Sequence, residues 1–149
     1  MKDTSNIFKL PPKELETKKS SLDVLWDDTA PEIVDFAKKL QAPVVVALHG
    51  DLGMGKSEIA RAIIKTLRGE DTVVPSPTFT IVQNYDGISH FDLYRLMDSS
   101  ELTEVGLQHA IQNDITLIEW PEIASDILPN DTIHLYITEL NGGRKIVVK

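Results

Sequence analysis

Eight residues from Gly50 to Ser57, GDLGMGKS, contain three glycines, a lysine and a serine at the spacing G-x-x-x-x-G-K-[ST]. This spacing is typical of the loop that binds the phosphates of nucleoside triphosphates. Glycines permit the backbone angles that turn amide groups toward an anion, and they place no Cβ in its way. We therefore predict that Lys56 contacts the outer phosphates and that the Ser57 hydroxyl binds Mg²⁺.

The residues on either side of this loop predict the elements that position it. The run PVVVALH, residues 43–49, is apolar and rich in β-branched residues, as expected for a strand buried on both faces. After the loop, apolar residues recur at helical spacing up to Gly69, namely Ile59, Ala60, Ile63, Ile64 and Leu67. The start of this helix would direct the positive end of its dipole at the bound anion. The strand, loop and helix together favour phosphate binding over a chance glycine-rich turn.

The remaining segments predict the rest of a mixed sheet. SLDVLW reads as a short strand, and TAPE starts a helix with a capping-box pattern. TFTIVQNY and ISHFDLY, separated by Asp86-Gly87, predict one hairpin, while TIHLYITEL and RKIVVK predict another. Between the hairpins, SSELTEVGLQHAI reads as short helical turns and DITLIEW as a buried strand.

We therefore predict an α/β fold of the P-loop NTPase type. Its mixed sheet would be parallel at the centre and antiparallel at the edge hairpins, with helices on both faces. Residues 1–20 are polar and contain Pro11 and Pro12, so we expect a flexible lead-in there and a single domain over residues 21–149.

Two acidic residues follow apolar residues near the ends of predicted strands, Asp92 in HFDLYR and Glu119 in TLIEW. Ligands of doubly wound sheets bind at the carboxyl ends of the strands, so either carboxylate can hold Mg²⁺ or orient an attacking water. The sequence does not rank the two, and an ordinary strand-end charge is the alternative for each. In the segment PSPTFT, residues 75–80, the hydroxyl of Thr78 is one of three that can reach a γ-phosphate or its metal.

Composition restricts the class of protein. The 149 residues are 42% hydrophobic, which is enough for one core, and the lack of cysteine excludes disulfides and thiol catalysis. No segment approaches about 18 apolar residues, so we expect no membrane span and a cytoplasmic location. A formal net charge of −8 argues against tight, unassisted binding to nucleic acid. The four histidines show no metal-ligand spacing, and we interpret them as structural or exposed.

Five motifs occur in a characteristic order between roughly Leu22 and Val148: GDLGMGKS, PSPTFTIVQNY, HFDLYRL, ELTEVG and IEWPE. In this combination the chain resembles the TsaE family of bacterial ATPases, which serve the threonylcarbamoyl modification of tRNA adenosine 37. The resemblance implies a Mg²⁺-dependent ATPase of low intrinsic rate. It also implies that the protein binds a transferase heterodimer without carrying out the transfer, and that it contacts tRNA only indirectly.

The resemblance also implies roles for individual residues. Lys56 would bind the outer phosphates, and Thr78 would lie in the loop that senses the γ-phosphate. Ser57 and Asp92 would serve Mg²⁺, while Glu119, itself a candidate Mg²⁺ ligand, would form with Trp120 an acid–aromatic pair needed for activity. The residues expected to contact the nucleotide are Asp51, Leu52, Gly53, Met54, Gly55, Lys56, Ser57, Glu58 and Trp120.

Three other functions fit the phosphate loop less well. A GTPase would carry an N-K-x-D motif for base recognition, which this chain lacks. A small kinase needs a substrate domain and usually an arginine-bearing lid, for which the chain has little room. A nucleotide-dependent binding module with negligible hydrolysis stays open, and phosphate release with and without the heterodimer distinguishes it from an ATPase.

Overall fold

A computed structural model describes residues 21–24, 31–75, 81–140 and 143–149 of the chain. The strands are β1 (Ser21–Val24), β2 (Val44–His49), β3 (Val82–Asn84), β4 (Ile88–Asp92), β5 (Ile115–Glu119), β6 (Ile133–Leu140) and β7 (Gly143–Val148). The helices are α2 (Pro31–Lys38), α3 (Lys56–Arg68), α4 (Glu101–Glu104), α5 (Leu107–Asn113) and the 3₁₀ turn η1 (Pro121–Ala124).

Within the described residues the strands form one seven-stranded sheet in the order β1-β7-β6-β2-β5-β4-β3. At its centre β2 pairs in parallel with β5 and with β6, and β4 pairs in parallel with β5. Toward the edges the pairs β3–β4, β6–β7 and β1–β7 are antiparallel. The predicted mixed sheet, parallel at the centre and antiparallel at the edge hairpins, is confirmed.

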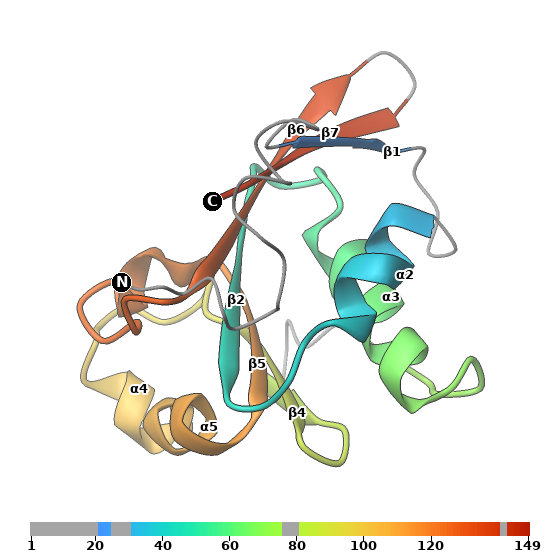
Figure 1. Ribbon diagram of the computed structural model, residues 1–149. Coiled ribbons are helices and arrows are strands. Elements are labelled where there is room, and N and C mark those ends of the chain that lie inside the picture. Colours follow the sequence, from blue (N-terminus) through green and yellow to red (C-terminus); the bar gives the residue numbers. More distant parts are fainter. Residues whose placement is uncertain (1–20, 25–30, 76–80, 141–142) are drawn as a thin grey trace.

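Helices cover both faces of this sheet (Figure 1). The longer helices α2 and α3 lie side by side over one face, and the short helices α4 and α5 lie over the other (Figure 1). Each face has its own cluster of buried apolar side chains. The prediction of helices on both faces is therefore confirmed.

Strand β2 lies between the two clusters, as its β-branched sequence predicts. Val44, Val46 and Leu48 belong to the cluster under α2 and α3, whereas Val45 belongs to the cluster under α4 and α5. The predicted apolar stripe of α3 is buried at four positions, and Leu67 packs against the same cluster while partly exposed. The helix ends where expected, since Gly69 follows its last residue with a positive φ of 112°.

Some expectations concern residues outside the described ranges. The lead-in of residues 1–20, Thr29 and Ala30 of the capping-box pattern, and residues 141–142 between the two segments of the second predicted hairpin all lie there. So do residues 76–80, which include Thr78. Within the described part of the chain, no helix combines the length and apolar character needed to cross a bilayer.

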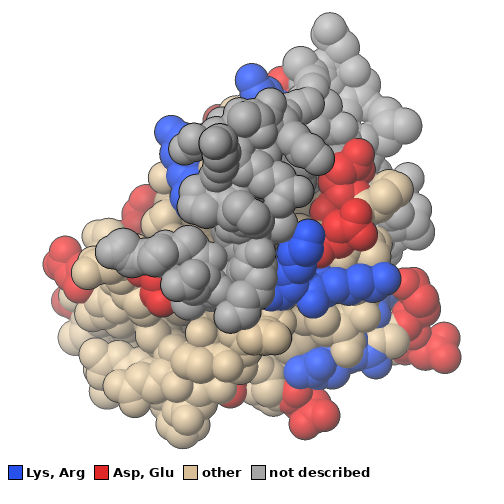
Figure 2. Space-filling model, in the orientation of Figure 1, with Lys and Arg blue, Asp and Glu red and all other residues tan. Residues whose placement is uncertain are grey.

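The charged side chains do not form a broad basic surface on the face drawn in Figure 2. Lysine and arginine occur there in short stretches bordered by aspartate and glutamate, and much of that face is uncharged. This pattern agrees with the formal net charge of −8.

The helix α3 depends on its buried face for stability. We expect Ile63→Ala to lower the free energy of unfolding by about 2–5 kcal/mol, because Ile63 is fully buried and its loss leaves a cavity. The control Val73→Ala, at a position that is 81% exposed, should change it by less than about 0.5 kcal/mol. Urea denaturation of both variants measures the difference, and equal losses would contradict this packing.

Candidate functional site

The loop between β2 and α3 needs glycine at three positions. Gly53 and Gly55 have φ angles of 80° and 99°, which side-chain-bearing residues rarely adopt. A Cβ on Gly50 would lie 3.0 Å from the carbonyl oxygen of Ile137 in β6. Because Gly55 is also the N-cap of α3, no side chain caps the first amides of the helix. Those amides and the helix dipole remain available to an anion.

This loop forms one wall of a cavity of about 390 Å³ at the carboxyl ends of β4 and β5. Ten of the described residues line the cavity: Leu52, Gly53, Gly55, Lys56, Ser57, Glu58, Asp92, Glu119, Trp120 and Arg144. Nine of these ten are residues that the sequence analysis proposed for the nucleotide, the metal or catalysis. The fold thus brings together the nine predicted residues, although 68 positions of the sequence separate the first of them, Leu52, from the last, Trp120.

Lys56 is a buried cation at the base of the loop, with 5% of its surface exposed. Its Nζ donates hydrogen bonds to the carbonyl oxygens of Gly50 at 2.6 Å and Asp51 at 3.0 Å. The same Nζ lies 4.1 Å from the ring centre of Trp120, a cation–π contact. Burial lowers the pKa of Lys56, and the negative charge of Glu119 most strongly opposes that shift. An anion in the cavity would find this ammonium group already in position.

The two candidate carboxylates are neighbours across the sheet. Asp92 ends β4 and Glu119 ends β5, and the parallel register pairs one with the other. Both are buried, with 7% and 3% of their surfaces exposed. An Oδ1 atom of Asp92 accepts a hydrogen bond from the amide of Tyr94 at 3.0 Å. This bond fixes the orientation of the Asp92 side chain at the end of its strand.

Glu119 has different partners from Asp92. The hydroxyl of Ser57 lies 3.0 Å from each of its carboxylate oxygens and donates to them. On the other side, Nε2 of His90 lies 2.6 Å from Oε2 of Glu119, and His90 is only 1% exposed. The interpretation of the histidines as structural or exposed overlooked this contact. The alternation of side chains between the two faces of a strand could have indicated it, because this alternation places His90 on the same face of β4 as Asp92.

The oxygen atoms of Ser57, Asp92 and Glu119 suit a hard divalent cation. Among the described residues no group of three or more His, Cys, Asp or Glu side chains forms a complete metal cage. A cage is not required for Mg²⁺ at a nucleotide site, because protein supplies one or two ligands and phosphate and water supply the rest. The donor set therefore fits a Mg²⁺ ion carried by a nucleotide.

Trp120 reaches the cavity because its backbone is in the left-handed region, with a φ of 57°. Such a conformation costs a side-chain-bearing residue roughly 1–3 kcal/mol. It turns the chain from β5 into η1, which begins at Pro121. The indole then lies between the ammonium group of Lys56 and the ring of Tyr94, whose centroid is 4.8 Å away. The indole thus covers one side of the cavity.

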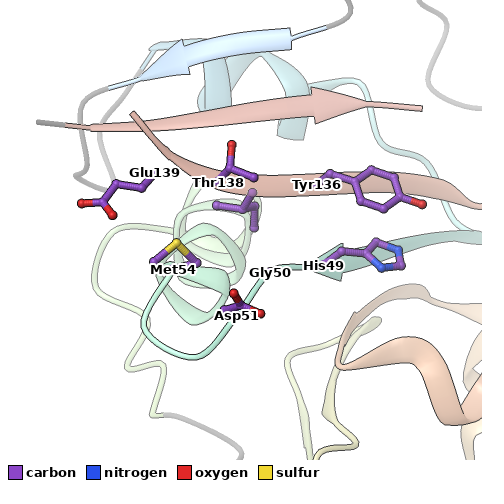
Figure 3. Close-up of a pocket in the computed structure, with 8 residues that line it drawn as sticks. His49, Gly50, Asp51, Met54, Tyr136, Thr138 and Glu139 are labelled. Atoms are coloured by element: carbon purple, nitrogen blue, oxygen red, sulfur yellow. The ribbon is translucent and has the colours of Figure 1, made fainter. Parts of the chain in front are cut away.

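Two of the predicted nucleotide-contacting residues point their side chains elsewhere. Asp51 and Met54 line a second hollow of about 400 Å³ on the other flank of the loop, facing Tyr136, Thr138 and Glu139 of β6 (Figure 3). Met54 also packs against the core cluster under α3. Its side chain therefore does not line the cavity beside Lys56 and Ser57.

Arg144 of β7 joins this loop to the far end of the chain. Its Nε donates a hydrogen bond to the carbonyl oxygen of Met54 at 3.1 Å, and its side chain also lines the cavity. Sequence analysis did not select Arg144, because a separation of 90 residues leaves no local pattern to detect.

Comparison with known proteins shows which family this chain belongs to. A sequence model of the family described as "Threonylcarbamoyl adenosine biosynthesis protein TsaE" matches residues 27–146. The tRNA threonylcarbamoyladenosine biosynthesis protein TsaE of Rickettsia bellii is 41% identical over 74% of this chain and 80% of its own length. The protein of that name from Haemophilus influenzae is 40% identical over 69% and 68%.

Among solved structures, the crystal structure of Bacillus subtilis YdiB has the same fold. It superposes with a TM-score of 0.60 at 24% identity, covering 85% of this chain and 82% of YdiB. The family match spans most of the chain, and the relatives exceed 30% identity over more than two thirds of their lengths. This chain belongs to the TsaE family of tRNA threonylcarbamoyladenosine biosynthesis proteins.

Proposed function

We propose that this protein binds and hydrolyses ATP with Mg²⁺, as a switch that the threonylcarbamoyl modification of tRNA adenosine 37 requires. The observation that carries the proposal is the single cavity that joins Lys56 and Ser57 of the loop to Asp92 and Glu119 at two strand ends. A phosphate-binding loop alone would support binding. Buried carboxylates beside it add the groups that hydrolysis requires.

The charges around the cavity support a requirement for Mg²⁺. Three acidic residues line it, Glu58, Asp92 and Glu119, and two basic residues, Lys56 and Arg144. A triphosphate entering this cavity adds strong negative charge next to two buried carboxylates. A divalent cation held by Ser57 and Asp92 would offset that charge and stabilise the charge that develops on the phosphoryl oxygens.

In the proposed mechanism the loop and Lys56 bind the phosphates. Lys56 exchanges its hydrogen bonds with the carbonyls of Gly50 and Asp51 for bonds to the outer phosphates. Glu119 orients the attacking water and accepts its proton, since its buried carboxylate lies at the strand end beside Ser57. Trp120 excludes bulk water from that side, and Thr78 would sense the γ-phosphate from the loop of residues 75–80.

The proposed partner is the transferase heterodimer of the same pathway. The protein would act on that complex through cycles of ATP binding and hydrolysis and would not carry out the transfer. Its net charge of −8 supports this division of labour, because a tRNA would be held mainly by the partner. We place this activity in the cytoplasm, together with the tRNA that the pathway modifies.

We expect Lys56→Ala to weaken ATP binding by about tenfold or more, the effect of losing a hydrogen bond to a charged group. Lys39→Ala, at an exposed position outside the cavity, is the control and should bind ATP as the wild type does. Isothermal titration calorimetry with ATP and Mg²⁺ measures both. An unchanged affinity in Lys56→Ala would remove the basis for phosphate binding at this loop.

Substitution of Asp92 and substitution of Glu119 should impair different properties, Mg²⁺-dependent nucleotide binding in the first case and hydrolysis in the second. Asp92→Asn should weaken Mg²⁺-dependent nucleotide binding as well as turnover, because a metal ligand loses its charge. Glu119→Gln should retain ATP and Mg²⁺ while hydrolysis falls by about 100-fold or more, as expected for a lost general base.

Mg²⁺ titrations and single-turnover hydrolysis, with and without the heterodimer, measure these two carboxylate variants. Glu104→Gln on the exposed side of α4 is the matched control and should behave as the wild type does. If Glu119→Gln lost Mg²⁺ affinity while Asp92→Asn kept it, the two roles would be reversed. Nucleotide binding without any phosphate release, even with the heterodimer present, would instead indicate a binding module.

We expect the isolated protein to bind tRNA more weakly than about 10⁻⁵ M at physiological salt, because its formal net charge of −8 opposes binding to a polyanion. Electrophoretic mobility shifts of tRNA with this protein, with the heterodimer and with both measure the effect. A micromolar, salt-dependent complex of tRNA with the protein alone would show that tRNA contact is direct.

A further inference from the structure

A buried histidine touches the proposed general base from the side opposite the phosphate loop. His90 lies in the middle of β4, between β3 and β5, and pairs in register with Gln83 on one side and Leu117 on the other. It is 1% exposed and Glu119 is 3% exposed, so bulk water does not separate them. A polar side chain so deeply buried in a central strand calls for a reason beyond packing.

The contact fixes which nitrogen carries the proton. Nε2 of His90 lies 2.6 Å from Oε2 of Glu119, a distance at which an ionised carboxylate accepts and the imidazole must donate. Nδ1, the other ring nitrogen, is buried and has no hydrogen-bond partner among the described residues. An unpaired acceptor there is less unfavourable than an unpaired buried N–H. The geometry therefore favours an imidazole with its proton on Nε2, facing Glu119.

Because of this hydrogen bond, the two oxygens of the Glu119 carboxylate have different partners. Oε2 accepts the His90 N–H and shares the one hydrogen of the Ser57 hydroxyl, whereas Oε1 has, among the described residues, only its share of that hydroxyl. The lone pairs of Oε1 are therefore less occupied, so Oε1 is the better acceptor for a water proton. The carboxylate also has a competing partner in Lys56, whose positive charge attracts it. A donor behind Oε2 restrains the carboxylate from turning toward Lys56.

From this geometry we propose that His90 is a positioning residue that orients the carboxylate of Glu119 for ATP hydrolysis. It acts through Glu119 and does not line the cavity itself. The inference rests on the proposed ATPase function and deepens it. It predicts that the rate of the chemical step depends on His90 while ATP affinity does not.

The test compares His90→Leu, which removes the donor, with His90→Gln, whose amide N–H can replace Nε2–H. We expect His90→Leu to lower the single-turnover hydrolysis rate about tenfold or more and to change the Kd for ATP less than about twofold. His90→Gln should regain most of the rate. His109→Leu, on the exposed side of α5, is the matched control and should match the wild type.

A double-mutant cycle separates positioning from a general structural defect. If His90 acts through Glu119, adding His90→Leu to Glu119→Gln should cause no further loss of rate, because the carboxylate is already absent. An equal loss in both backgrounds, or a faster rate in His90→Leu, would overturn the role of His90 and leave the ATPase assignment standing.

A spectroscopic measurement does not depend on turnover. In the wild type, ¹⁵N chemical shifts of His90 should show a protonated Nε2 and a bare Nδ1, and Glu119→Gln should perturb both signals. A proton on Nδ1 in place of Nε2 would overturn the proposed contact. If the wild type released no phosphate even with the heterodimer, the proposed function itself would fail, whatever the tautomer.

Discussion

The parallel pairing of β2 with β5, and of β5 with β4, ends three strands at the same edge of the sheet. One strand delivers the phosphate loop, and the other two deliver Glu119 and Asp92. The register matters as much as the direction, since a shift of one residue would turn these side chains to the opposite face of the sheet. The buried β-branched residues of β2 and β5 make such a shift costly. The chemistry of the site thus depends on the apolar packing beneath it.

Burial has two opposing effects on the charged side chain of Lys56. It disfavours the charged form of Lys56, and it strengthens every interaction that Lys56 makes with its neighbours. This cost is offset by the contacts of the ammonium group with two loop carbonyls and an aromatic ring and by the charge of nearby carboxylates. The fold thus holds the ammonium group at the base of the loop, where in the proposed function the outer phosphates would replace the two carbonyls. Such preorganisation is a general way to stabilise charge in a dry site.

Local patterns in the sequence predicted the elements well. The loop, its helix and the Asp86-Gly87 hairpin follow from spacing, periodicity and turn residues within short segments. They also placed Asp92 and Glu119 at strand ends, which the structure confirms. Contacts between strands that are distant in the sequence could not be predicted in the same way, because they depend on register.

Two contacts depend on register in this way: the contact between His90 and Glu119 and the hydrogen bond from Arg144 to Met54. The left-handed backbone at Trp120 is another example, since no residue type there favours it. Local sequence therefore identified the candidate groups that the fold brings together. Their individual partners required the assembled sheet.

The hydrogen bond from Arg144 to the carbonyl of Met54 also has a consequence during synthesis of the chain, because its two partners are made at different times. Translation proceeds from the N-terminus, so Met54 in the loop is made 90 residues before its anchor Arg144. The β6 strand against which Gly50 packs is likewise added late. On the ribosome, a nascent chain therefore carries this loop without its anchor until β7 has emerged.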